Sequence, residues 1–316
     1  MVNNRVNLNI VYAPQPGPDR KIFENEHGEI WHSKKKHPQK INIGMGWYSI
    51  RDPKPGDNIL VLEPFCVLPK DYNIPFLKRF KYIFTWATKA ITNHRIKKRV
   101  IEINHPSCLG IEREKVGKGW VPWKQRKNEI VFIANNKSST HNSELYSLRL
   151  QLADFLSKQQ SKYKISWYGH FKLKRPYYKG PIRSKHDILR QVKFSICTEN
   201  CYHPAYSFNY FTEKLPEVWK GGAVPLYMGC YNIDAFSFPS QSYIDLRNFT
   251  KRDGKEYNIL GPKLMERIKS YSENEYERYL QKLKNKIMIP QALYHHISYK
   301  RMWRTMINTF YRGQAE

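Results

Sequence analysis

The segment Tyr210–Lys214 (YFTEK) combines residue types suited to binding an anion. It follows an apolar strand that ends in Glu199-Asn200, and it begins a predicted helix with Thr212 as the N-cap. The amide groups of a helix N-terminus and an adjacent lysine together attract phosphate or carboxylate. The segment therefore predicts an anion site at Lys214, although the residues alone equally allow Glu213 and Lys214 to be ordinary polar residues of a helix start.

A second cation is expected near the same point. Arg149 interrupts the apolar stripe of a helix predicted over Leu145–Leu156, one turn from Leu145 and Leu152. Its guanidinium must either extend past the apolar face into solvent or meet an anion, and a diphosphate would satisfy it.

The cysteines do not form a recognisable framework. Five are present, and none is spaced as a CxxC pair, so reduced thiols are expected. Cys197, Cys201 and His203 resemble part of a zinc set, but a fourth ligand at suitable spacing is missing.

The elements that must position these residues read as alternating strands and helices. In the second half, apolar strands are predicted at Ile130–Ala134, Ile165–Tyr168, Phe194–Cys197, Ala223–Met228 and Tyr243–Leu246, with helices between them over Leu145–Leu156, Lys185–Gln191 and about Phe211–Lys220. Gly221-Gly222 should end the last of these helices. This order predicts a doubly wound parallel sheet, in which ligands bind beyond the carboxyl ends of strands, here after Ile133, Cys197 and Met228.

The first half is also rich in predicted strands. They lie at Val6–Tyr12, Ile59–Leu62, Tyr82–Trp86 and Val100–Ile103. The Gly-, Lys-, Trp- and Pro-rich stretch from Cys108 to Lys127 is expected to link the two halves, and the tail Gly261–Arg312 is helical by pattern.

Composition limits the possible classes of protein. With 316 residues, 41% hydrophobic and 14% aromatic, the chain can form about two packed domains, which argues against disorder. A formal net charge of +27 favours polyanionic partners without choosing among nucleic acid, a membrane surface and phosphate ligands. The basic clusters have no nucleic-acid-binding motif around them. No signal peptide or spanning segment is recognised, so a cytoplasmic protein, peripheral to a membrane at most, is expected.

The stretch Thr198–Phe249 resembles the donor-binding signature of the α-1,3/1,4-fucosyltransferases, glycosyltransferase family 10. The matching motifs are Glu199-Asn200, Tyr210–Lys214, Gly222–Pro225 and Tyr243–Phe249, and Arg149–Leu152 is similar to the family's helix with a phosphate-binding arginine. Thr198 replaces the usual phenylalanine, and the loop Cys201–Asn209 is longer and more aromatic than in the bacterial relatives.

The resemblance implies the α/β GT-B fold, two Rossmann-like domains facing a central cleft. Residues 1–127 would bind the acceptor, 128–290 would bind a GDP-sugar, and 291–316 would form a helix that packs back on the first domain. It also implies the donor site: Lys214 and Arg149 hold the diphosphate and Glu213 the ribose. Glu199, Asn200, Tyr210 and Thr212 complete the donor-binding set. No obligatory metal or other cofactor is implied, and no Asp-x-Asp motif occurs.

An inverting transfer of this kind needs a carboxylate base, and Glu63 is the candidate. Glu63 ends the strand Ile59–Leu62 and precedes Pro64, a context similar to that of the family's base. Competing carboxylates are Glu102, Asp52 and Asp57, and Glu63 itself can instead be a structural loop cap.

The resemblance thus implies a metal-independent glycosyltransferase that moves L-fucose from GDP-fucose to a hydroxyl of a glycan or glycolipid. Two alternatives stay open. One is a transferase for another GDP-sugar on the same scaffold, and the other is a non-enzymatic protein that binds polyanions or membranes through its positive charge. For the C-terminal segment, the apolar stripe Trp303, Met306, Ile307, Phe310 and Tyr311 favours packing on the first domain over contact with a membrane.

Overall fold

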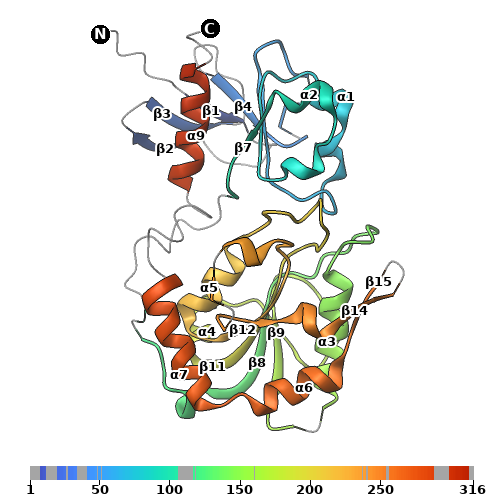
Figure 1. The fold of residues 1–316 in the computed structure, drawn as a ribbon, viewed down its shortest axis with the longest axis vertical. Helices are drawn as coiled ribbons and strands as arrows, with labels where there is room; N and C mark the ends of the chain where they lie inside the picture. The colour runs from blue at the N-terminus through green and yellow to red at the C-terminus, as the bar shows by residue number, and fades with distance from the viewer. Residues whose placement is uncertain are drawn as a thin grey trace. The chain divides into compact units, whose positions relative to one another are not determined.

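The structure, a computed structural model, divides the chain into two compact units (Figure 1). It describes residues 8–11, 20–25, 28–33, 41–47, 49–50, 52–105, 117, 119–159, 161–236, 238–239, 241–253, 256–287 and 299–312. The first unit comprises Met1–Pro106 and Ser298–Glu316, and the second comprises Ser107–Ile297. The boundary therefore lies before the segment in which the sequence placed the domain linker.

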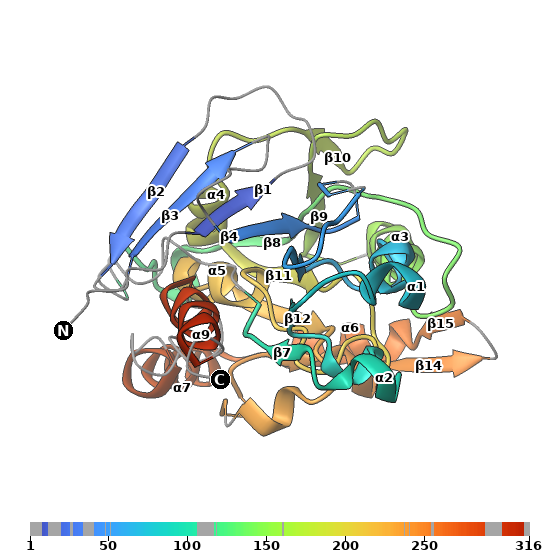
Figure 2. The same cartoon turned by 90° about the horizontal axis from the view of Figure 1, so that it is seen from above.

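A mixed sheet forms the centre of the first unit. Its described strands run in the order β2-β3-β1-β4-β5-β6-β7, and Figure 2 shows the first four side by side. Among the described strands of this sheet, only β2 is antiparallel to its neighbour. The bounds are β1 Leu8–Val11, β2 Arg20–Asn25, β3 Gly28–Ser33, β4 Ile41–Met45, β5 Asn58–Val61, β6 Ile83–Thr85 and β7 Val100–Glu102. Short helical turns connect them: η1 Pro69–Tyr72, α1 Ile74–Leu77, η2 Thr88–Ala90 and α2 His94–Lys97.

The C-terminal helix α9 (Tyr299–Arg312) belongs to this first unit and packs on its sheet. Its apolar stripe contributes Met302, Trp303, Met306, Ile307 and Phe310, each no more than 5% exposed. These side chains form one core with residues of the sheet strands and of the segment after β7: Leu8, Ile43, Leu60, Phe84 and Ile103. Because this stripe is buried inside the unit, it is not available to lie on a membrane.

The second unit contains a parallel sheet in the order β10-β9-β8-β11-β12-β13. This is the Rossmann order, with the first strand at the centre beside the fourth. The strands are β8 Lys127–Ile133, β9 Lys164–Tyr168, β10 Tyr178–Gly180, β11 Val192–Thr198, β12 Val224–Met228 and β13 Ile244–Asp245. A hairpin of β14 Thr250–Asp253 and β15 Glu256–Ile259 follows. The doubly wound sheet predicted from the alternating elements is therefore present.

Helices lie between the strands of this sheet and after the hairpin. They are α3 Tyr146–Ser157, α4 Lys185–Gln191, α5 Lys214–Gly221, α6 Gly261–Ser270 and α7 Glu273–Lys282, with shorter helical turns η4 Trp123–Gln125, η5 Ile233–Phe236, η6 Leu246–Phe249 and η7 Leu283–Ile287. No helix among the described residues has both the length and the apolar character needed to cross a membrane.

The described residues before β8 are part of this second unit rather than a free linker. Trp123 is buried in its core, and the indole of Trp120 donates to the Lys220 carbonyl at 2.8 Å. The buried Arg126 guanidinium donates to the carbonyls of Val121, Leu189, Val192 and Gly221. Arg126 thereby satisfies carbonyl groups near the ends of α4 and α5, which stabilises this part of the sheet.

Candidate functional site

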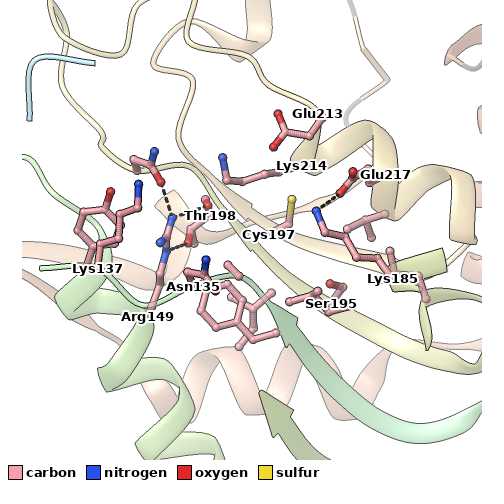
Figure 3. A pocket seen from close by; sticks show the side chains of 18 residues that line it. Asn135, Lys137, Arg149, Lys185, Ser195, Cys197, Thr198, Glu213, Lys214 and Glu217 are labelled. Atoms are coloured by element: carbon pink, nitrogen blue, oxygen red, sulfur yellow. Dashed lines mark hydrogen bonds and ion pairs between the residues drawn. The ribbon is translucent and has the colours of Figure 1, made fainter. Parts of the chain in front are cut away.

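A cavity of about 280 Å³ lies at the carboxyl ends of β8 and β11. These two strands are neighbours, and the chain leaves them toward opposite sides of the sheet, so the cavity occupies the topological switch point where such folds bind ligands. Its lining comprises apolar and polar side chains from these strands and from α3, α4 and α5 (Figure 3): Phe132, Ile133, Ala134, Asn135, Lys137, Tyr146, Arg149, Lys185, Leu189, Ser195, Ile196, Cys197, Thr198, Asn200, Glu213, Lys214, Glu217 and Val218.

Helix α5 begins beside this cavity, but its first turn differs from the sequence prediction. The N-cap is Glu213, whose side chain makes no capping hydrogen bond, rather than Thr212. The hydroxyl of Thr212 accepts instead from the Lys214 amide at 3.4 Å and belongs mainly to a buried network described below. The helix ends as predicted, because Gly222 adopts a left-handed conformation with φ 73°.

Glu199 is fully buried and serves as the anchor of Lys214. Its carboxylate accepts from the amide and the hydroxyl of Thr212 at 3.1 and 2.8 Å, and from the Lys214 ammonium at 2.8 Å. Burial acts to lower the pKa of Lys214, but the nearby carboxylates of Glu199 and Glu213 outweigh it and raise that pKa. Lys214 therefore stays protonated while its side chain lines the cavity.

Arg149 is also held in place rather than extended into solvent. Its side chain on α3 is 1% exposed; Nε donates to the Thr198 hydroxyl at 2.9 Å, and Nη2 donates to the carbonyls of Thr198 and Glu199. The guanidinium carbon lies 4.7 Å from the Tyr146 ring centroid. Arg149 thus ties α3 to the end of β11 and places a buried positive charge at the cavity wall.

Asn200 and Tyr210 extend the hydrogen-bond network that begins at Arg149. Asn200 accepts a hydrogen bond from Arg149 at 3.2 Å and donates to the Tyr210 hydroxyl at 3.0 Å. Of the seven donor-site residues predicted from sequence, Arg149, Asn200, Glu213 and Lys214 line the cavity. Glu199, Tyr210 and Thr212 are almost completely buried and support these residues from behind.

Several further polar residues of the cavity were not predicted individually from the sequence, among them three charged residues and an asparagine. Asn135 and Lys137 lie in the loop after β8, which the strand pattern did mark as a binding position. Lys185 of α4 and Glu217 of α5 form an ion pair at 3.0 Å (Figure 3). With these residues, four cationic side chains and two carboxylates surround the cavity, so its charge favours an anionic ligand.

Glu63 lies in the first unit, two residues after the end of β5, with a half-buried side chain. The backbone on either side of it is held: the Trp86 indole donates to the Leu62 carbonyl at 2.7 Å, and the Tyr72 hydroxyl donates to the Glu63 carbonyl at 2.9 Å. This gives Glu63 a fixed position at the carboxyl edge of the sheet, the edge used for ligands in open α/β sheets.

The competing carboxylates have other surroundings. Asp52 pairs with Arg79 at 2.6 Å, Asp57 accepts from the Lys54 amide at 2.7 Å, and Glu102 is an exposed residue of the edge strand β7. Asp71 was not considered from the sequence. It is 1% exposed and accepts from the Trp47 amide, and burial, together with the Glu63 carboxylate, raises its pKa to about 6.

The partial zinc set does not assemble. Cys197 and Cys201 are separately buried free cysteines, and His203 Nδ1 accepts from the amides of Ala205 and Tyr206. Across the described part of the chain, no group of three His, Cys, Asp or Glu side chains is placed to hold a metal ion.

Comparison with known structures defines the class of the fold, which is that of GT-B glycosyltransferases. An α1,3-fucosyltransferase with GDP matches with a TM-score of 0.54 at 14% identity, covering 97% of this chain and 91% of that one. A second α1,3-fucosyltransferase structure matches with a TM-score of 0.53 at 16% identity, covering 96% of this chain and 89% of that one. A glycosyltransferase from Rickettsia africae ESF-5 matches with a TM-score of 0.51 at 10% identity, covering 89% of this chain and 84% of that one.

The family follows from sequence. The C-terminal model of glycosyltransferase family 10 (fucosyltransferase) matches residues 123–302, more than half of the chain. The protein belongs to this family, which confirms the resemblance seen in Thr198–Phe249. Comparison with curated protein sequences finds no match.

Proposed function

We propose that the protein transfers L-fucose from GDP-fucose to a hydroxyl group of a glycan or glycolipid, with inversion at the sugar carbon. The observation that supports this proposal best is the cationic cavity at the switch point, where Lys214 and Arg149 are positioned by buried hydrogen bonds. A nucleoside diphosphate supplies the negative charge that these side chains and the α5 amides can bind.

Departure of GDP is the step that the cavity serves. When the bond between the fucose carbon and the diphosphate oxygen breaks, its electron pair leaves with GDP and negative charge develops on that oxygen. Lys214, Arg149 and the N-terminal amides of α5 would stabilise this charge, since they are positioned before the reaction. We propose on this basis that the transfer needs no metal ion, and activity should persist in excess EDTA.

The acceptor hydroxyl would attack from the face opposite the leaving group, and its proton must pass to a base. Glu63 is assigned this role, because it follows β5 at the carboxyl edge of the first sheet and its backbone is fixed by Trp86 and Tyr72. Glu213 is assigned to the ribose hydroxyls, since it lines the cavity beside Lys214.

Thermal unfolding against a panel of nucleotides tests the donor. A ligand that binds only the native state raises the midpoint in proportion to the logarithm of its concentration above Kd. GDP and GDP-fucose should raise the midpoint, whereas UDP and CMP should not. Turnover with GDP-fucose against other GDP-sugars then separates fucose transfer from the use of a different sugar.

Equal shifts with UDP and GDP would contradict the assignment of GDP as the nucleotide of the donor. If no nucleotide binds while generic polyanions do, the non-enzymatic alternative gains support. In that case the binding should show a steep dependence on salt concentration.

A further inference from the structure

Six exposed cations gather at the amino-terminal edge of the sheet in the first unit. They are Lys78, Arg79, Lys81, Lys97, Lys98 and Arg99, which we call the basic edge. Lys78, Arg79 and Lys81 precede β6, and the other three precede β7. Because β6 and β7 are parallel neighbours, the residues before them meet at one edge of the sheet.

Hydrogen bonds fix these two segments to each other. The Arg99 guanidinium donates to the Lys78 carbonyl at 2.9 Å and to the Phe80 carbonyl at 3.4 Å. The Ile83 amide donates to the Arg99 carbonyl at 2.9 Å, and the Lys81 amide donates to the Asp57 carbonyl at 2.8 Å. The cations are therefore carried on a rigid part of the fold, and ordering them on binding costs little backbone entropy.

Few acidic groups neutralise this edge. No Asp or Glu occurs from Lys78 to Arg99. Among the described residues of the neighbouring loop, Asp52 pairs with Arg79, and the nearly buried Asp57 accepts from the Lys54 amide. Keeping so many like charges together without matching carboxylates costs electrostatic free energy, which a bound anionic surface recovers.

The basic edge is not the donor site or the edge that holds Glu63. Glu63 follows the carboxyl end of β5, whereas the basic edge precedes the strands, so the length of the sheet separates them. Within the first unit, the basic edge is therefore separate from the edge that holds Glu63. Helix α9, a second basic segment of the first unit, has its apolar stripe buried in the core and leaves Arg301, Arg304, Asn308 and Arg312 exposed.

The chemistry of the basic edge favours a membrane over nucleic acid. Binding of single strands uses exposed aromatic rings as stacking platforms, whereas the aromatic residues beside these cations, Phe80 and Tyr82, are buried and half-buried. Reading of duplex DNA uses a helix or ribbon that enters a groove, whereas the helix here, α2, has only four residues. Anionic headgroups need neither device, since several surface lysines and arginines suffice to attract them.

We propose that the basic edge binds an anionic lipid surface and holds this first unit at the membrane as a peripheral protein. The variant Lys78→Gln/Lys81→Gln/Lys97→Gln/Lys98→Gln removes four of the charges but keeps Arg79 and Arg99, which make the ion pair and the carbonyl contacts. Its matched control carries four exposed lysines of the second unit changed in the same way: Lys172, Lys174, Lys263 and Lys269.

Co-sedimentation with phosphatidylcholine vesicles, with and without phosphatidylglycerol, measures the binding. The wild type and the control should bind only the anionic vesicles, and added salt should weaken that binding. The basic-edge variant should bind at least about a hundredfold more weakly, since each lysine near such a surface is worth about fivefold. The double variant Lys97→Gln/Lys98→Gln should bind anionic vesicles about thirtyfold more weakly than wild type. This second variant keeps the test valid if the variant with four substitutions folds poorly.

The proposal is overturned if the wild type does not bind anionic vesicles. It is also overturned if the basic-edge variant and its matched control bind them equally. It is also overturned if a single-stranded oligonucleotide of the same charge displaces the vesicles and binds more tightly. Binding of GDP should be the same in all variants, so failure here is distinguishable from failure of the proposed donor.

Discussion

The ammonium of Lys214 lies 2.8 Å from the carboxylate of Glu199, which is fully buried beneath the cavity. A residue expected to bind the donor is therefore also the counter-ion of a core carboxylate. Binding and stability are coupled at this position, because removal of the lysine leaves a buried charge without its cation.

Lys214→Ala should consequently lose both GDP affinity and stability. The lost partner of Glu199 should cost about 3 kcal/mol of unfolding free energy, measured by urea denaturation. The double variant Glu199→Gln/Lys214→Met should recover most of this stability without recovering GDP binding. If Lys214→Ala unfolds at the wild-type urea concentration, the ion pair does not support the fold.

Lys137→Ala should behave differently, because Lys137 is exposed in the loop after β8. We expect roughly fivefold to tenfold weaker GDP binding by calorimetry and an unchanged unfolding midpoint, since only one charge-assisted contact is lost. Lys172→Ala, another exposed lysine of the second unit, is the control and should leave the affinity unchanged. Identical GDP affinity in both variants would remove Lys137 from the donor site.

Glu63→Gln should lower kcat by about 10² to 10⁴ while GDP still binds. Glutamine preserves the shape of the side chain, and the hydrogen bonds from Trp86 and Tyr72 reach backbone carbonyls, so the fold should persist. Glu102→Gln serves as the control on an exposed carboxylate of the same unit. Normal turnover of Glu63→Gln would move the role of base to another group.

Stability should depend on pH through Asp71, whose pKa is raised from 3.8 to about 6. The folded state favours the protonated carboxyl, so stability is lost as the pH rises from about 4 through 6. Asp71→Asn removes this loss and can still accept from the Trp47 amide. The variant should therefore gain up to about 3 kcal/mol relative to wild type across this window, measured by urea denaturation at each pH. A constant difference in unfolding free energy between wild type and Asp71→Asn from pH 4 to 8 would contradict the raised pKa of Asp71.

Met306→Ala tests the packing of α9 on the first sheet. Met306 is fully buried in the core shared with Leu60 and Phe84, so truncation should cost about 2 to 5 kcal/mol. Arg304→Gln, on the exposed face of the same helix, should be nearly neutral. Removal of the chain after Ser298 should destabilise the first unit more severely, and an unchanged melting temperature would argue against this packing.

Much of the second unit could be predicted from local patterns. The apolar run Ile130–Ala134 and the stripe of Leu145–Leu156 each report their own secondary structure, because burial on one face sets the spacing of apolar residues. The order of these elements then implied the parallel sheet and its binding edge. The hairpin of β2 and β3 was not predicted, since neither strand is a continuous apolar run.

The roles within the site depended on tertiary structure. The sequence brought Arg149, Asn200, Glu213 and Lys214 to one region, but it did not distinguish them from Glu199, Tyr210 and Thr212, which are buried behind the cavity wall. Neither did it pair Lys185 with Glu217, which are thirty-two positions apart and meet only where α4 and α5 converge. Spacing along the chain specifies the face of a helix or strand, whereas burial and long-range partners are decided by how the whole sheet is wound.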